Sequence, residues 1–278
     1  MKVAYYLGID GGGSFCRARL RDAQGALLGE ATGDMANIHQ DFDRAINSIL
    51  ATALAAGGEV PLHHIHAGLG LAGATGPAQC ARVQAVGLPF ASAKVDSDGY
   101  IACLGAHGGG DGGIVIAGTG SAGFALVAGQ RMSIGGHGFM LGDQGSGAVI
   151  GRAALQNALL AHDNIVPGTA LTRQIMAQFH DDPGEAIAWS RTALSRDYAS
   201  FAPMALAAAQ AGDHDALAIV AQAADGLANM GRQLRRAGAP RLCLIGGLGA
   251  AISRWLPADM FAPPLADPLE GAILLARQ

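Results

Sequence analysis

A glycine-rich turn occurs twice in this sequence, each time between two short strands, and this repeat leaves few folds open. The first turn, Asp10-Gly11-Gly12-Gly13-Ser14, follows an apolar run from Val3 to Ile9. After the turn, residues 15–21 alternate between apolar side chains and arginines, which is the two-residue period of a strand. A dinucleotide-binding fingerprint and a Walker loop both place a helix after their glycines, so the sequence argues against both.

Residues 1–112 are predicted to form a mixed sheet covered by helices. A third strand near residues 26–31 completes an antiparallel meander, and residues 42–54 carry apolar side chains at helical spacing before Gly57-Gly58. The elements after them are a strand at 65–71, a helix at 78–86 and a short strand at 93–95. The order of three strands, helix, strand, helix, strand is typical of a ribonuclease H-like core.

The same pattern then restarts. The second turn, Gly118-Thr119-Gly120-Ser121, lies between apolar runs at 113–116 and 123–127. The later predicted elements are a strand at 130–134, several helices in the alanine-rich stretch 147–237, a strand at 242–245 and a helix at 268–277. An internal repeat indicates two copies of one unit. We therefore predict one domain of residues 1–112 with the C-terminal helix segment 266–278, and a second domain of residues 113–265.

Composition limits the partners of this chain. Half of its 278 residues are hydrophobic, which supports two domains, and a net charge of -4 with scattered Lys and Arg offers no basic surface for nucleic acid. The four cysteines lie too far apart in the sequence for a metal or disulfide framework, and we interpret them as free thiols of a protein in a reducing compartment. No apolar run reaches the roughly 20 residues that span a bilayer, and no signal peptide is evident. We expect a cytoplasmic protein without nucleic-acid or membrane partners.

Two glycine turns in equivalent places can bind one polyphosphate from both sides, because glycine lets backbone N–H groups approach phosphate oxygens. The predicted phosphate-binding residues of the turns are Gly11, Gly12, Gly13, Ser14, Gly118, Thr119, Gly120 and Ser121. Asp10, at a strand end, is the predicted site for Mg²⁺, which it would hold through the waters of the ion. Either turn alone could instead be an ordinary hairpin turn.

Asp98 is the predicted catalytic base. Phosphoryl transfer needs one group to orient and deprotonate the acceptor hydroxyl, and Asp98 follows the last strand of the first domain, where open sheets place their ligands. Asp96 competes for this role because it lies two residues away on an extended chain. The alternative is that one of these aspartates only caps the helix that begins near Tyr100.

The segment 135–147 is unusually rich in glycine and polar residues, and we expect it to line the substrate cleft. Gly136 and Asp143 are its predicted substrate-binding residues. Asp143 and Ser146 could also cap the following helix, and the two roles are compatible. His137 has no Cys or His partner near it in the sequence and is not predicted to bind a metal.

Taken together, these motifs resemble the N-acetylglucosamine kinase and BadF/BadG/BcrA/BcrD ATPase group of the actin-like ATPase and hexokinase superfamily. Residues 10–14 resemble its first phosphate motif, Ser97-Asp98 its catalytic-base segment and residues 118–121 its second phosphate motif. Residues 246–249 resemble its adenosine motif and 267–272 its closing helix. The resemblance implies an α/β protein with two ribonuclease H-like domains and an interdomain cleft. It adds Gly246, Gly247 and Gly249 as ATP-binding residues, and Asn37, Asp98 and Asp143 as sugar-binding residues.

The resemblance implies an ATP- and Mg²⁺-dependent sugar kinase that phosphorylates the 6-hydroxyl of an amino sugar, with N-acetylglucosamine as the first choice. A homodimer is consistent with it. Ser14 replaces a common threonine and keeps its hydroxyl, whereas Gln144 replaces a common glutamate and Ala72 a serine, which leaves the sugar open. The alternatives are a glucosamine kinase, an ATPase activator of an acyl-CoA dehydratase, which needs a cysteine-ligated iron–sulfur cluster, and a non-catalytic sugar sensor.

Overall fold

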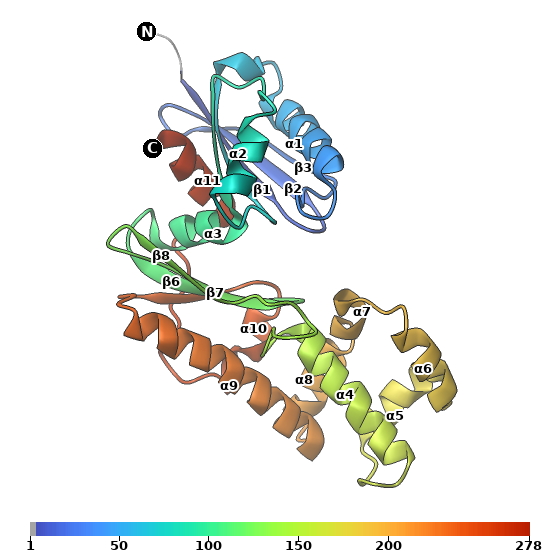
Figure 1. Cartoon of the computed structure of the whole chain (residues 1–278). Helices are drawn as coiled ribbons and strands as arrows, with labels where there is room; N and C mark the ends of the chain where they lie inside the picture. Colours follow the sequence, from blue (N-terminus) through green and yellow to red (C-terminus); the bar gives the residue numbers. More distant parts are fainter. Residues whose placement is uncertain (1–3) are drawn as a thin grey trace. The chain divides into compact units, whose positions relative to one another are not determined.

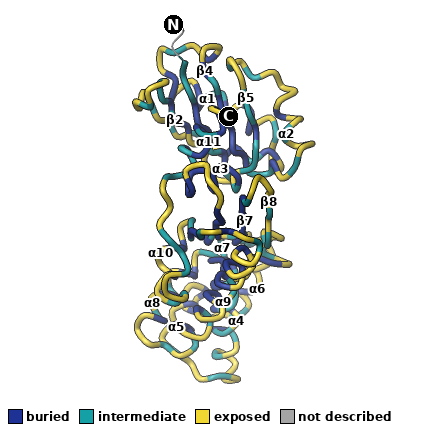
Figure 2. Tube along the Cα trace, turned by 90° about the vertical axis from the view of Figure 1, so that its left-hand side faces the viewer, coloured by how far each residue is buried: buried dark blue, intermediate teal, exposed yellow. Residues whose placement is uncertain are grey.

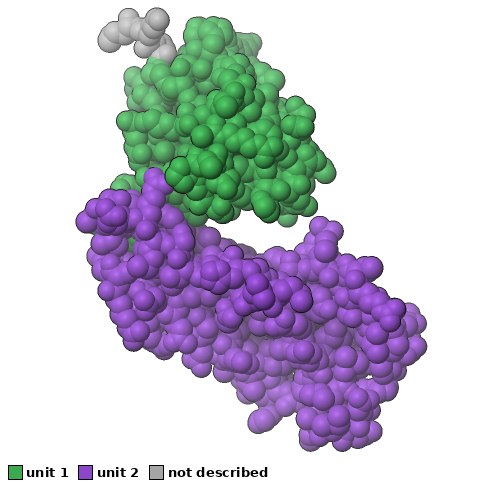
Figure 3. All heavy atoms as spheres, in the orientation of Figure 1, with its two compact units in different colours: residues 1–112, 263–278 green, residues 113–262 purple. Residues whose placement is uncertain are grey.

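The computed structural model describes residues 4–278, which form two compact units (Figures 1 and 3). Unit 1 contains residues 4–112 and 263–278, and unit 2 contains residues 113–262. Val3, where the first predicted strand begins, lies outside the described residues. In both units the buried residues lie mainly on the strands and on the helix faces that pack against them (Figure 2).

Unit 1 contains a five-stranded mixed sheet in the order β3-β2-β1-β4-β5. The strands β1–β3 form an antiparallel meander, and β4 and β5 continue the sheet in parallel with β1. The elements are β1 (Tyr5–Gly11), β2 (Cys16–Asp22), β3 (Leu27–Gly33), α1 (Phe42–Gly57), β4 (Ile65–Leu71), α2 (Pro77–Gln84), β5 (Ser92–Ser97), α3 (Asp98–His107) and α11 (Pro268–Arg277).

The two faces of this sheet differ because side chains alternate along each strand. Leu7 and Ile9 of β1 share one apolar core with Ala45 and Ile49 of α1. On the opposite face, a Cβ at Gly8 would overlap the carbonyl of Leu269 in α11. Glycine in β1 therefore lets the C-terminal helix α11 lie directly on the sheet, next to α3 (Figure 1).

Ion pairs attach α11 to β2 as well. The Arg19 guanidinium donates to both carboxylate oxygens of Asp267, at 2.9 and 2.8 Å, and to Glu270 at 2.8 Å. Arg21 also pairs with Glu270. Arg17, Arg19 and Arg21, whose alternation predicted the strand, thus lie on one face of β2, and the last two form ion pairs with α11 and its N-cap residue Asp267.

Unit 2 repeats the first four strands of this topology in a sheet of order β8-β7-β6-β9. Its strands are β6 (Gly112–Ala117), which begins one residue before the unit, β7 (Ser121–Val127), β8 (Gln130–Gly135) and β9 (Leu242–Ile245). Its helices are α4 (Gly147–His162), α5 (Ala170–Met176), α6 (Pro183–Ser190), α7 (Ser195–Ala199), α8 (Ala202–Gln210), α9 (His214–Arg236) and α10 (Gly249–Ile252).

No described strand of unit 2 corresponds to β5. After α10 the chain reaches the edge of the sheet only at Ala262, whose N–H donates to the Leu242 carbonyl at 2.8 Å. Pro263 and Pro264 follow, and proline has no N–H to continue a ladder. The repeat predicted from the sequence is therefore present, but its second copy is one strand shorter. No helix within residues 4–278 is both long and apolar enough to cross a membrane.

Candidate active site

The first glycine turn, residues 11–14, is held in place by the backbone on both sides. The Gly12 N–H donates to the Phe15 carbonyl at 2.9 Å, and the carbonyls of Gly11 and Gly12 accept from Ala72 and Ala36 at 2.7 and 2.9 Å. A Cβ at Gly11 would lie 2.7 Å from the Leu71 side chain, so this glycine is needed for packing. Gly13 and Ser14 are exposed and free to contact a ligand.

Asp10, the predicted magnesium residue, lies at the end of β1 opposite Arg17 on β2. Arg17 Nη2 lies 2.5 Å from Asp10 Oδ2, and the Asp10 side chain is only 15% exposed. Within residues 4–278, no group of three or more potential metal-ligating side chains is assembled. The single Asp10 carboxylate at the end of β1 fits an ion that keeps most of its waters, as Mg²⁺ commonly does.

Asp98 is the first residue of α3, directly after β5. The helix is capped by Ser97, whose Oγ accepts from the Tyr100 N–H at 3.1 Å, so neither Asp96 nor Asp98 is the N-cap. The carboxylate of Asp98 accepts from the Gly99 N–H at 2.8 Å, and its side chain is exposed. Although Asp98 reaches the surface, the protein atoms packed around its carboxyl group partly desolvate it, and this desolvation, together with the negative charge of Asp10, raises the pKa of Asp98. A raised pKa suits a general base, because it strengthens the affinity for the proton.

Asn37 lies beside the first glycine turn. Its Oδ1 accepts from the backbone N–H groups of His39 and Gln40 at 2.9 and 3.2 Å. A Cβ at Gly13 would lie 4.0 Å from Asn37 Nδ2. The amide oxygen is thus engaged by the backbone, and the amide nitrogen lies near the turn as a donor for a ligand.

The second glycine turn, residues 118–121, lies at the N-terminus of α4. The N–H groups of Gly147 and Ala148 donate to the carbonyls of Gly118 and Thr119 at 2.8 and 3.2 Å. Ser121, predicted as an ATP ligand, is 3% exposed, and its hydroxyl donates to the Gln144 carbonyl at 2.8 Å. That hydroxyl is therefore occupied within the protein.

Asp143 lies beneath this turn. Its backbone has a φ of 61°, and its side chain is only 7% exposed. Burial raises the pKa of Asp143, whereas the hydrogen bonds that it accepts from the N–H groups of Ser121 and Gly138 lower it. Gly136 lies close by, where its N–H donates to the Ser121 carbonyl at 3.1 Å. The helix cap is Ser146, so Asp143 holds the turn and does not cap the helix.

A pocket of about 550 Å³ opens in unit 2 beside the second glycine turn. It is lined by Gly118, Thr119, Gly147, Ala199, Ala202, Pro203, Leu206, Ala207, Gln210, Gly247, Leu248 and Ala251. Of the predicted adenosine residues, Gly247 lines it, whereas Gly246 has a φ of 98° and a Cβ there would overlap the Ala117 carbonyl. A Cβ at Gly249 would lie 3.3 Å from Leu244. Gly246 and Gly249 thus shape the backbone around the pocket.

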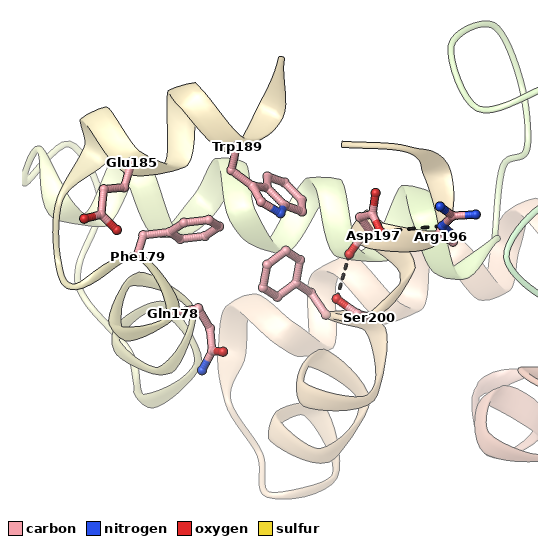
Figure 4. Close-up of a pocket in the computed structure, with 8 residues that line it drawn as sticks. Gln178, Phe179, Glu185, Trp189, Arg196, Asp197 and Ser200 are labelled. Carbon is pink, nitrogen blue, oxygen red and sulfur yellow. Dashed lines mark hydrogen bonds and ion pairs between the residues drawn. The ribbon is translucent and has the colours of Figure 1, made fainter. Parts of the chain in front are cut away.

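A second pocket, of about 460 Å³, is lined by residues between Gln178 and Phe201 (Figure 4). The rings of Phe179, Trp189 and Phe201 pack there, with Trp189 edge-on to both phenylalanines at 5.5 and 5.6 Å between centroids. Phe201 lines this pocket, while its neighbour Ala202 lines the pocket beside the glycine turn. The aromatic cluster therefore supports the wall of that pocket from behind.

Sequence reasoning missed the α8 residues that form this wall. Their side chains are mostly small and apolar and recur at three-and-four spacing, which is also the pattern of any helix packed on a core. Only Gln210 departs from that pattern.

The chain is similar to known sugar kinases along nearly its whole length. A glucosamine kinase of Vibrio cholerae serotype O1 is 41% identical over 98% of this chain and 95% of its own length. The solved structure of a Chromobacterium violaceum protein, assigned as an N-acetylglucosamine kinase, is 33% identical, with a TM-score of 0.91 over 99% of this chain and all of that one. A glucokinase of Streptomyces griseus, solved with glucose and AMPPNP, has a TM-score of 0.57 at 19% identity over 99% of this chain and 100% of its own, which shows the fold alone.

These relatives confirm the predicted actin-like ATPase fold, and sugar kinases are among the homologues that match along the full length of the chain. Residues 7–259 match the BadF/BadG/BcrA/BcrD ATPase family, and the chain therefore belongs to that family.

Proposed function

We propose that this protein transfers the γ-phosphate of ATP to the 6-hydroxyl of an amino sugar, and that the acceptor is glucosamine. The observation that carries the choice of sugar is the 41% identity, along nearly the whole chain, to the glucosamine kinase of Vibrio cholerae. The sequence motifs favoured N-acetylglucosamine, with glucosamine as the alternative. The similarity to the Chromobacterium violaceum protein keeps N-acetylglucosamine as the second candidate.

ATP would bind in the 550 Å³ pocket of unit 2, with its phosphates at the second glycine turn. Two features support this placement. Glycines let the backbone approach phosphate oxygens, and the N-terminus of α4 lies against the same turn, where the positive end of the helix dipole favours negative charge even though its first N–H groups donate to the turn. Gly12, Gly13 and Ser14 of unit 1 would bind the phosphate chain as well.

Asp10 would hold Mg²⁺ through its waters, and the ion would neutralise charge on the phosphate oxygens. Arg17, which pairs with the same carboxylate, would hold Asp10 in a fixed orientation. Asp98 would accept the proton of the attacking hydroxyl, a role for which its exposed position and raised pKa are suited. Asp96 is less suited, since its side chain is partly buried whereas that of Asp98 is exposed.

The Asn37 amide nitrogen would donate to a sugar hydroxyl, with its orientation fixed by the two N–H groups on its oxygen. Sugar binding by Asp143 and Gly136 stays a prediction, because the buried Asp143 carboxylate already accepts two backbone N–H groups. A homodimer also stays a prediction.

The proposal is tested by measuring ATP- and Mg²⁺-dependent turnover with glucosamine, N-acetylglucosamine, N-acetylmannosamine and glucose, with the product mass determined. We expect the highest kcat/KM with glucosamine and a product heavier by one phosphoryl group. A higher kcat/KM with N-acetylglucosamine would replace the acceptor but keep the kinase. ATP hydrolysis without sugar phosphorylation would refute the kinase and favour the ATPase-activator alternative.

A further inference from the structure

The pocket beside the second glycine turn has polar side chains at its two ends only. Of its lining residues, Thr119 and Gln210 alone carry a polar side chain, and the others are glycine, alanine, proline and leucine. Thr119 belongs to the glycine turn. Any specific polar recognition of the rest of a ligand by a side chain of this pocket therefore falls to Gln210.

Helix α8 fixes the distance between these ends. A Cβ at Gly147 would lie 3.3 Å from the Gly118 carbonyl oxygen and 3.6 Å from Ala202 Cβ, so the start of α8 adjoins the glycine turn. Gln210 is the last residue of α8, and the rise of about 1.5 Å per residue places it roughly 12 Å further along the axis. A nucleotide whose phosphates lie on the turn would extend its base towards Gln210.

The Gln210 side chain is exposed, and among residues 4–278 it takes part in no side-chain hydrogen bond. Its carboxamide therefore offers both an acceptor oxygen and a donor nitrogen. The residues between it and the turn, such as Leu206 and Ala207, can bury the flat face of a base but cannot distinguish one purine from another.

We propose that Gln210 reads the six-membered edge of a purine, and that the pocket accepts adenine and guanine nucleotides with little discrimination. The inference rests on the proposed placement of the nucleotide. Adenine presents a donor amino group beside the acceptor N1, and guanine presents an acceptor O6 beside the donor N1–H. A carboxamide matches the first order or, after turning by half a revolution, the second.

Substitution by glutamate separates the two bases. In Gln210→Glu the carboxylate only accepts, so its two oxygens can take the adjacent N1–H and N2–H donors of guanine together. Beside adenine, one oxygen can take the N6–H but the other faces the lone pair of N1. The loss of one bidentate match changes base discrimination by about tenfold to a hundredfold. Gln210→Leu removes both matches and should weaken the two nucleotides equally. The matched control is Gln178→Glu, which adds the same charge at an exposed glutamine of the aromatic pocket.

The experiment measures the dissociation constants of ADP and GDP by calorimetry in the absence of sugar. Thermal unfolding of each variant is measured alongside to check that it is folded. We expect the wild type to bind both within about tenfold, Gln210→Glu to shift the ratio towards GDP by tenfold or more, and Gln178→Glu to leave it unchanged. A wild type that prefers ADP by more than about a hundredfold, or an unchanged ratio in Gln210→Glu, overturns the inference. If the wild type binds neither nucleotide, the placement of ATP fails with it. Binding of both without sugar phosphorylation would refute only the kinase.

Discussion

Replacing Gly120 by alanine tests whether the second glycine turn is fixed by Asp143. The added Cβ would lie 2.9 Å from Asp143 Oδ2, whereas ordinary contact begins near 3.4 Å. The carboxylate must therefore move by about 0.5 Å, and a displacement of that size substantially weakens the van der Waals contacts of a packed group. It cannot move freely, because it is buried and accepts the N–H groups of Ser121 and Gly138.

The cost follows from these contacts. Overpacking a filled site, or weakening a hydrogen bond to a buried charge, each destabilises by about 1–3 kcal/mol. For a unit of this size we expect the melting temperature to fall by roughly 2–12 °C. Since the same turn is the proposed phosphate site, ATP affinity should fall by at least about tenfold, the equivalent of ~1.4 kcal/mol.

Calorimetric unfolding and ATP titration of the same protein measure both effects. The control is Gly118→Ala in the same turn, where a Cβ would meet only the Gly120 carbonyl oxygen at 3.9 Å and stability should be unchanged. A Gly120→Ala protein that melts and binds ATP like the wild type would show that Asp143 does not fix the turn.

The remaining predictions concern the proposed base and the sugar. Asp98→Asn should lower turnover by about a hundredfold or more while nucleotide binding is kept, and near-normal turnover would remove Asp98 from the mechanism. A raised pKa means that ionised Asp98 lowers the free energy of unfolding at neutral pH, and this destabilisation disappears as the pH falls and the carboxyl group is protonated. Asp98→Asn should therefore raise the melting temperature slightly at neutral pH and not in acid. Wild-type kcat/KM should fall as the pH drops through the raised pKa of Asp98, measured with a pH-independent coupling assay. Asn37→Ala should raise the sugar KM and leave ATP affinity intact, and an unaltered sugar KM would exclude Asn37 from the site.

Local patterns in the sequence were sufficient to predict most elements. The strands Ile65–Leu71 and Leu242–Ile245 and the helix Pro268–Arg277 have the predicted bounds, because apolar runs between turn residues determine them. The missing fifth strand of unit 2 could not be predicted in this way. It depends on where the chain after α10 meets Leu242, a contact between distant residues that no local period encodes.

The candidate site was predictable to the level of motifs but not of side-chain direction. Ser121 has the hydroxyl expected of a phosphate ligand, yet that hydroxyl donates to the Gln144 carbonyl. Gly11 has the residue type of a phosphate loop, yet the contact that requires glycine there is with Leu71. A motif specifies which groups are near a ligand, and tertiary packing decides which of them are already occupied.

Asp143 shows how these two levels combine within unit 2. The resemblance of its glycine-rich segment to that of amino-sugar kinases implied that this carboxylate holds a sugar. In the structure it accepts N–H groups both from that segment, at Gly138, and from the second glycine turn, at Ser121. A displacement of either strand of backbone would cost a hydrogen bond to a buried carboxylate, which is among the more expensive bonds to lose. The segment proposed to bind the sugar and the turn proposed to bind phosphate must therefore keep one geometry or move together, so the affinities for sugar and ATP should be coupled through this single side chain.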